Sequence, residues 1–192
     1  MNAMTKNCGV MIGGIAMLLL SAVASAQEQD GYFGGNFSII NYEEDFLSTL
    51  SLDGDSKLSL KAINGILGYS FTPNLSAEAR IGFGAGKDSF TDGSFTYVTS
   101  IDTLVGAYLK AQLDTGSGIN PYLILGFTEV SLEVEITELG FSATDDDSDT
   151  SFGVGILGKI NDGSQWSLEY MNYYDKEGVE ITGINLGALA KF

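Results

Sequence analysis

The stretch LSAEARIGFGAGK, residues 75–87, alternates strictly between two kinds of side chain. Its odd positions are apolar from Leu75 to Ala85, whereas its even positions hold serine, glutamate, arginine and glycine. A repeat of two residues predicts a β-strand with one apolar face. In a soluble sandwich that face packs into the core, whereas in a membrane barrel it faces lipid. The alternation by itself fits both architectures.

The length of the alternating segments favours the barrel. Residues 97–113 repeat the pattern, with Tyr97, Ile101, Val105 and Leu109 on one side. Strands of soluble proteins usually have about 5–6 residues, whereas a tilted strand that spans a bilayer needs about 9–11. These segments have the length of spanning strands.

The connections between the alternating segments differ at the two ends. The second and third segments are joined only by TPN, whereas long acidic stretches follow the first and the fifth. Short turns at one end and longer loops at the other are typical of outer-membrane barrels. We therefore predict an all-β fold, an eight-stranded antiparallel up-and-down transmembrane β-barrel. The predicted strands are 31–42, 58–71, 75–87, 96–113, 121–136, 150–160, 165–175 and 180–192.

Aromatic residues gather beside the predicted short turns. Tyr69, Phe71, Tyr122 and Trp166 lie there on the face interpreted as apolar, and Phe192 closes the last strand. Aromatic side chains are favoured where a membrane meets water. The sequence thus predicts an aromatic girdle at one boundary of the barrel.

Residues 1–26 have the pattern of a secretory signal peptide. Lys6 precedes an apolar run, and Ala24 and Ala26 form a small-x-small cleavage site. The alternative, an N-terminal anchor helix, is less favoured because the run falls short of the ~20 residues that a span needs. We expect an exported chain whose barrel domain covers residues 27–192. The only cysteine, Cys8, precedes the apolar run, so neither a lipid anchor nor a disulfide is expected.

The composition weighs against several function classes. The chain carries a net charge of −16 and has no histidine. Such an acidic protein repels nucleic acid. Histidine is the commonest general base and a common transition-metal ligand, and a Ser-His catalytic pair needs it. We predict no enzyme activity, no catalytic residue, no metal site and no cofactor.

Several segments together resemble a known family. They are GYFGGNFS, LGYSFTPNLSAEARIGFG, INPYLILGF, SFGVGILGKINDGSQWSLEYMNYYD and the terminal LGALAKF. They look like the small eight-stranded outer-membrane barrels of Gram-negative bacteria, the porin-family relatives of the OmpA transmembrane domain and of OmpX. The resemblance implies an outer-membrane location, and we expect both termini on the periplasmic side. The chain departs from full-length OmpA in having nothing after Phe192, so we expect no peptidoglycan-binding domain. The resemblance also implies that Leu186, Ala188, Ala190 and Phe192 form the signal that the barrel-assembly machinery reads.

Charged residues on the polar faces should point into the lumen. The expected residues are Glu78, Arg80, Asp102, Lys110, Glu129, Lys159, Glu169 and Lys191. The interior of an eight-stranded barrel is just wide enough for side chains to fill it. We therefore expect a plug of ion pairs and hydrogen bonds. One alternative is a gated narrow channel in which the Arg80–Glu78 pair switches, and another, less favoured, is catalysis by paired carboxylates.

Two predicted loops are strongly acidic. They contain Glu43, Glu44, Asp45, Asp53 and Asp55 in the first, and Glu138, Asp145, Asp146, Asp147 and Asp149 in the other. Such charge is most simply a solvated surface, and the alternative is divalent-cation binding that bridges lipopolysaccharide phosphates.

These features together predict a structural or surface-interaction role in the outer membrane. We expect a monomer among outer-membrane lipids and lipopolysaccharide, whose acidic loops contact an extracellular ligand. A low-conductance pore for small solutes and a lipid A-modifying enzyme are the alternatives.

Overall fold

A computed structural model describes residues 31–44, 57–92, 95–136, 141–176 and 178–192 of the chain. The described residues form strands and turns, and they contain no helix suited to crossing a membrane. The strands are β1 (Gly31–Glu44), β2 (Lys57–Thr72), β3 (Leu75–Gly84), β4 (Lys87–Asp92), β5 (Phe95–Gln112), β6 (Ile119–Ile136), β7 (Phe141–Asn161), β8 (Ser164–Lys176) and β9 (Val179–Lys191).

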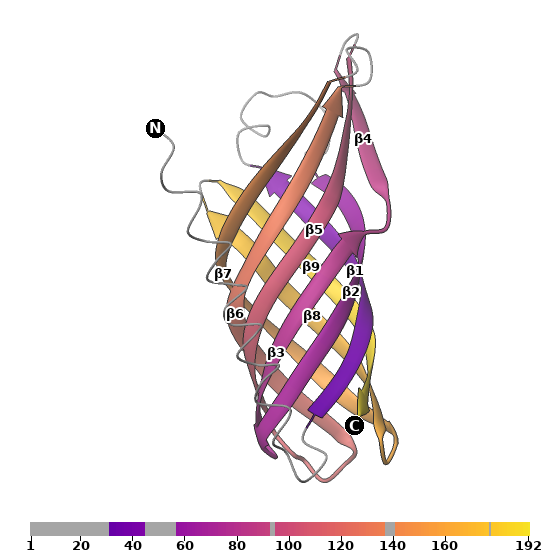
Figure 1. Cartoon of the computed structure of the whole chain (residues 1–192), viewed down its shortest axis with the longest axis vertical. Coiled ribbons are helices and arrows are strands. Elements are labelled where there is room, and N and C mark those ends of the chain that lie inside the picture. Colours follow the sequence, from indigo (N-terminus) through magenta and orange to yellow (C-terminus); the bar gives the residue numbers. More distant parts are fainter. Residues whose placement is uncertain (1–30, 45–56, 93–94, 137–140, 177) are drawn as a thin grey trace.

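The strands close into a barrel (Figure 1). Each strand pairs antiparallel with its neighbours, and β1 pairs with both β2 and β9. β3 and β4 pair one after the other with the same strand, β5, so they act as one strand of the wall. The barrel therefore has eight strands, and the predicted fold class is confirmed. Closure pairs the backbone groups of every strand in the wall, as a segment inside lipid requires.

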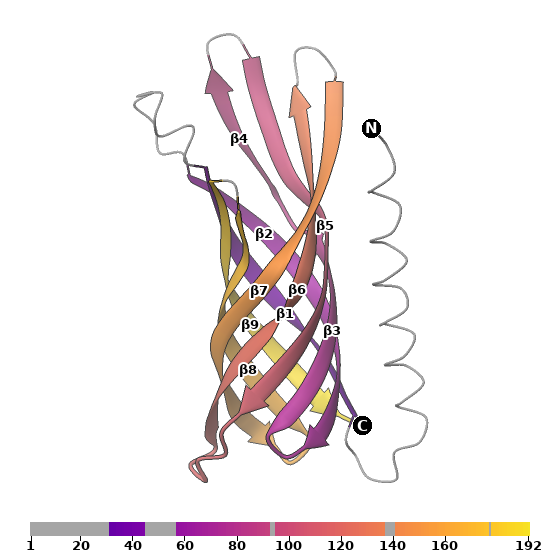
Figure 2. The same ribbon diagram turned by 90° about the vertical axis from the view of Figure 1, so that its left-hand side faces the viewer.

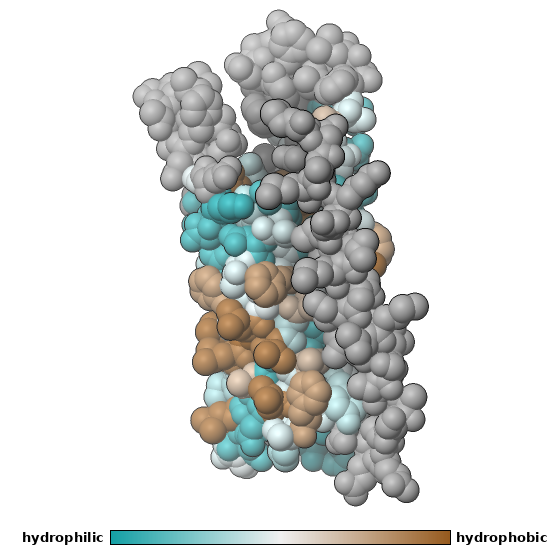
Figure 3. All heavy atoms as spheres, turned by 60° about the vertical axis from the view of Figure 1, so that its left-hand side comes forward, coloured by the Kyte–Doolittle hydropathy of each residue, from teal (hydrophilic) through white to brown (hydrophobic). Residues whose placement is uncertain are grey.

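Large apolar side chains cover the outside of the barrel. Leu123 is 63% exposed and Phe127 is 67% exposed. Similar outward residues include Phe33, Phe37, Ile63, Ile81, Phe83, Leu109, Leu125, Phe152, Val154, Ile184 and Leu186. Figure 3 shows such side chains as a brown belt on the lower part of the wall, with hydrophilic residues above it. This is the inverse of a soluble sandwich and suits a wall that faces hydrocarbon.

The two ends of the barrel differ. At one end, here called the turn end, residues 73–74, 113–118 and 162–163 connect the strands, β1 begins and β9 ends. At the other, the hairpin end, two hairpins continue beyond the wall (Figure 2). In outer-membrane barrels the short turns are periplasmic and the longer connections extracellular.

Two predicted loops are strands in the structure. Residues 88–92 belong to β4, and the acidic run 145–149 belongs to β7. The pairing of β6 with β7 continues to Ile136↔Phe141, so both hairpins extend as one sheet of β4, β5, β6 and β7. Aspartate is depleted in strands, which explains the wrong prediction. The partner strand β6 opposes the run with Val130 and Leu132 and supplies the backbone pairing.

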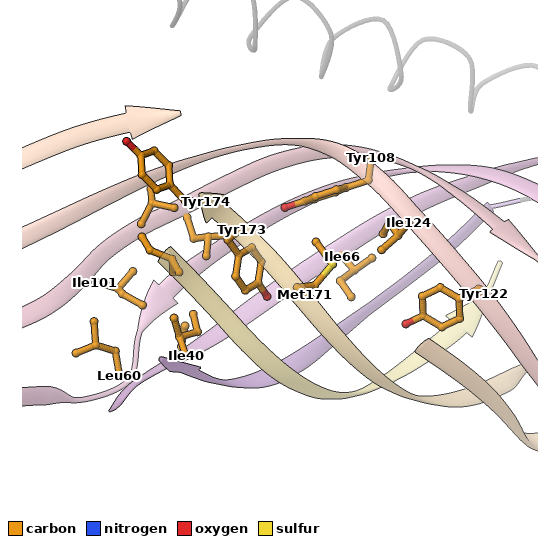
Figure 4. Close-up of a cluster of buried hydrophobic side chains, with 14 of the residues drawn as sticks. Ile40, Leu60, Ile66, Ile101, Tyr108, Tyr122, Ile124, Met171, Tyr173 and Tyr174 are labelled. Carbon is orange, nitrogen blue, oxygen red and sulfur yellow. The ribbon is translucent and has the colours of Figure 1, made fainter. Parts of the chain in front are cut away.

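The lumen has two layers of side chains. Near the hairpin end it holds a mainly apolar cluster that includes Ile40, Leu60, Ile101 and Tyr174 (Figure 4). Nearer the turn end the buried residues include the charged side chains of β3, β5 and β8. The lining of the lumen thus changes along the barrel axis, from mainly apolar near the hairpin end to charged nearer the turn end.

Candidate functional site

Four of the eight charged residues expected in the lumen form one buried network. Glu78 and Arg80 lie two residues apart on β3, so both point inward, while Lys110 comes from β5 and Glu169 from β8. The Arg80 guanidinium donates to both Glu169 carboxylate oxygens, at 2.6 and 2.9 Å. Its Nε and Nη2 donate to Glu78 Oε2 at 2.9 and 2.6 Å. Lys110 Nζ donates to Glu78 Oε1 at 2.5 Å.

Neutral side chains complete the coordination of the two carboxylates. The Tyr32 hydroxyl donates to Glu78 at 2.8 Å. The Tyr122 hydroxyl donates to Glu169 at 2.9 Å, and Asn185 Nδ2 donates to it at 2.8 Å. The two carboxylates face two cations, so the network is electrically balanced. Buried charges persist only when they are paired and hydrogen-bonded in this way.

Glycines in the wall make room for the tyrosine rings of the network. A Cβ at Gly68 would overlap the ring of Tyr32, and a Cβ at Gly155 would overlap the ring of Tyr122. Each ring therefore lies flat across the neighbouring strand. The Tyr32 ring also lies 4.5 Å from the Lys110 ammonium, within the range of a cation–π interaction.

The ion pairs of this network link strands of the barrel to one another. Arg80 joins β3 to β8 across the lumen, and Lys110 joins β5 to β3. In the described part of the chain, no group of three His, Cys, Asp or Glu residues is placed to hold a metal ion. The network ties opposite walls of the barrel together.

Comparison with known families identifies the barrel. The family described as outer membrane protein beta-barrel domain matches residues 13–192, which is nearly the whole chain. This protein belongs to that family. The predicted resemblance is confirmed, and the family together with the fold indicates the outer membrane as the location of this barrel.

Solved structures show the same architecture at low sequence identity. Neisserial surface protein A (NspA) is 13% identical, with a TM-score of 0.63 over 85% of this chain and 97% of its own. Ail, the attachment invasion locus protein of Yersinia pestis, crystallised with the heparin analogue sucrose octasulfate, is 14% identical, with a TM-score of 0.60 over 84% and 97%. The N-terminal β-barrel domain of Pseudomonas aeruginosa OprF is 12% identical, with a TM-score of 0.56 over 86% and 100%. No curated protein matches the chain. At these identities the likeness establishes a shared fold.

Of the other four charged residues expected in the lumen of this outer-membrane barrel, two do not point into it and two lie at its turn-end mouth. Asp102 is exposed, because a β-bulge between Ile101 and Thr103 shifts the alternation of β5. Glu129 alternates with the buried Thr128 and Val130 and so lies on the outer side of β6.

Lys159 and Lys191 do have the inward phase of their strands, but each lies at the turn end, where it is exposed. Lys159 pairs there with Asp162 at 2.7 Å. An inward-pointing position in the alternation therefore does not by itself bury a charged residue. Its position along the barrel axis also decides how exposed the side chain is.

Three residues of the expected girdle lie on the outer wall near the turn end. The rings of Tyr69 and Phe71 pack edge to face, with centroids 5.5 Å apart. Trp166 shares its face with the exposed Leu168 and Tyr170. The prediction is wrong for Tyr122, which is 5% exposed and points into the lumen. The outward phase of β6 belongs instead to Leu123 and its alternate neighbours.

The expected assembly residues lie along the outer face of β9. Leu186, Ala188 and Phe192 are exposed, and Ala190 is partly so. The Phe192 ring lies 6.1 Å from that of Phe33 on β1. This geometry joins the last strand to the first at the turn end, and their role in assembly stays a prediction.

Some predicted positions lie outside the described residues. They are Ala24 and Ala26 of the cleavage site, and Asp45, Asp53, Asp55 and Glu138 of the acidic segments. The signal peptide therefore stays a prediction as well.

Besides Tyr122, three residues bonded in or next to the network were not predicted from the sequence. Tyr32 and Asn185 occupy inward phases next to Phe33 and Ile184, which are exposed, so strict alternation could have found them. Tyr173 donates to Asn185 Oδ1 at 3.0 Å. It is the extra residue of a β-bulge in β8, which alternation does not reveal.

Proposed function

We propose that this protein is a closed outer-membrane barrel that presents a surface for a cationic extracellular ligand. The observation that carries the proposal is the sheet of β4, β5, β6 and β7 above the barrel wall (Figure 2). A wall that only spans the membrane does not need strands of this length, since about 9–11 residues suffice. β6 has 18 residues and β7 has 21.

The projecting part of β7 has an edge without backbone pairing to β8, which it contacts through the side chains of Asp147, Asp149 and Ser151. Among the described residues, positions 141–151 pair with β6, whereas pairing with β8 begins only at Phe152↔Asn172. An edge strand offers unpaired backbone groups to an extended segment of another chain. The part of the edge before Asp147 can bind another chain through its backbone, whereas the N–H groups of Ser148 and Thr150 donate to the side chains of Asp147 and Asp149.

The charge of this edge selects the ligand. Asp146, Asp147 and Asp149 lie on it within a chain of net charge −16. Ail was crystallised with a sulfated, anionic ligand. Aspartates on the edge would repel such a molecule, so the ligand here carries positive charge.

The filled lumen supports a closed barrel rather than a pore. A solute would have to displace both the apolar cluster and the balanced network of Glu78, Arg80, Lys110 and Glu169. We assign no catalytic role, because both carboxylates of the network are fully engaged by donors. The proposal includes a monomeric barrel held among outer-membrane lipids and lipopolysaccharide, and delivered there by the barrel-assembly machinery.

A binding experiment with purified protein in lipid nanodiscs tests the proposal. The probe is a short oligolysine peptide, with heparin as the anionic comparison. We expect saturable binding of oligolysine and none of heparin. The double variant Asp147→Asn with Asp149→Asn should weaken oligolysine binding and flatten its salt dependence, because it removes charge from the edge.

The control carries the same loss of charge at the other end of the barrel. Asp114→Asn with Asp162→Asn changes two exposed aspartates at the turn end and should leave binding unchanged. Equal losses in both double variants would mean that net charge alone attracts the peptide. Tighter binding of heparin than of oligolysine would overturn the proposal.

A further inference from the structure

A cavity of about 420 Å³ opens inside the barrel at the turn end. This volume is within the range of small-molecule pockets, about 300–1,000 Å³. Its lining comes from six strands and one turn, and consists of Gly31, Tyr32, Ser70, Phe71, Thr72, Pro73, Ser76, Lys110, Gln112, Gln165, Leu189 and Lys191. We call it the turn-end cavity.

The charge of the lining is one-sided. Two lysines, Lys110 and Lys191, line the cavity together with hydroxyl and amide side chains, and no lining residue is a carboxylate. The lining is therefore positively charged, although the chain as a whole has a net charge of −16. Cations and neutral donors that converge on a concave site favour an anion.

Lys110 can donate to a ligand in the cavity and keep its hydrogen bond to Glu78. An ammonium group has three donors, and among the described residues one hydrogen bond of Lys110 is found, to Glu78 Oε1. Arg80 and Tyr32 also donate to the Glu78 carboxylate. Glu78 therefore keeps hydrogen-bond donors when another anion approaches Lys110 from the cavity, and Lys191 supplies the cation that balances the added charge.

We propose that the turn-end cavity binds a small water-soluble oxyanion, a carboxylate or a phosphate, between Lys110 and Lys191. The ligand enters along the barrel axis from the periplasm. Tyr32, Ser76 and Lys110 are buried on the lumen side of their strands, so a head group held in the membrane would have to leave its leaflet to reach them. The network of Tyr32, Glu78 and Lys110 forms the inner end of the site.

This site is independent of the proposed extracellular surface, because it lies at the opposite end of the barrel. The experiment uses the full mature protein in non-ionic detergent micelles, with inorganic phosphate and acetate as separate probes. Side-chain amide signals of Gln112 and Gln165 report binding by NMR. We expect saturable shifts with at least one probe, and none with sodium chloride at matched ionic strength.

Two variants test the charge of the site. Gln165→Glu places a nearly isosteric anion in the lining, and Lys191→Gln removes a cation. Each should weaken binding by about ten-fold, since hydrogen bonds to charged groups carry that much affinity. Lys159→Gln removes an exposed lysine at the same end that does not line the cavity, and it should bind as the unmodified protein does.

Folding is checked first, by the heat-dependent gel mobility of the barrel. If Lys191→Gln does not fold, Gln165→Glu alone decides the question. Absence of saturable shifts with both probes would overturn the proposal. So would an equal loss of binding in Lys159→Gln, since that would make the effect one of general surface charge.

Discussion

Arg80 is the residue on which the two buried carboxylates depend. It is 6% exposed, and its guanidinium hydrogen-bonds both Glu78 and Glu169. A planar guanidinium suits this task because its donors form a rigid fork that matches carboxylate geometry. A buried ion network need not stabilise a fold more than apolar packing would, but removal of one partner leaves an uncompensated charge.

Substitution of Arg80 should therefore be costly. We expect Arg80→Met to lower the free energy of unfolding by roughly 3–5 kcal/mol, because it leaves two buried carboxylates with only one cation, Lys110. Urea unfolding in lipid vesicles measures the change. The control is Lys87→Met, which breaks an exposed pair with Glu135 at 3.8 Å and should cost about 0–1 kcal/mol. Similar costs for both variants would show that the lumen is hydrated enough to screen the network.

At the scale of the element, β7 serves in two environments. Its second half is part of the barrel wall, whereas its first half projects beyond β8. The Tyr174 hydroxyl of β8 donates to Asp147 Oδ2 at 2.6 Å across this boundary. This hydrogen bond lowers the pKa of Asp147 below its usual value. The bond thus joins the projecting sheet to the end of β8.

The direction of this pKa shift gives a prediction about pH. A lowered carboxyl pKa means that the contact contributes its full stability above the ordinary aspartate pKa and loses it as pH falls through the lowered one. In Tyr174→Phe the pKa of Asp147 should rise toward its usual range, as an NMR titration of the Asp147 carboxyl can measure. Asp162, whose pKa is lowered by Lys159 at the other end, should titrate unchanged. If the pKa of Asp147 were the same in Tyr174→Phe as in the unmodified protein, the proposed effect of the Tyr174 hydrogen bond would be contradicted.

At the scale of the whole molecule, the proposed closed barrel has two blocking layers in series. Apolar side chains of the buried cluster lie near the hairpin end, and the charged network below them spans the lumen from β3 to β8. A hydrophobic constriction blocks ions by dewetting, whereas an ion-pair network blocks them by occupying the space. If the side chains of one layer are shortened, we expect the other layer still to block ions.

Conductance in planar bilayers should follow this arrangement. The unmodified protein and the Arg80→Ser variant should both give no ohmic steps. Steps should appear when Arg80→Ser is combined with Ile40→Ala, Leu60→Ala and Leu104→Ala, because the side chains of both layers are then shortened. The triple alanine variant with Arg80 retained is the matched control and should stay silent. Stable steps from the unmodified protein would sink the closed-barrel proposal.

The sequence by itself determined the barrel, and only the tertiary structure decided what fills and extends it. Alternation such as that of residues 75–85 marks inward and outward faces locally, because side chains of a strand alternate by geometry. It therefore identified Glu78 and Arg80 as a pair. It was wrong for Asp102, since a bulge depends on the register between two strands. It was also wrong for the acidic run on β7, because strand formation there depends on pairing with β6, which is a property of the hairpin and not of the run.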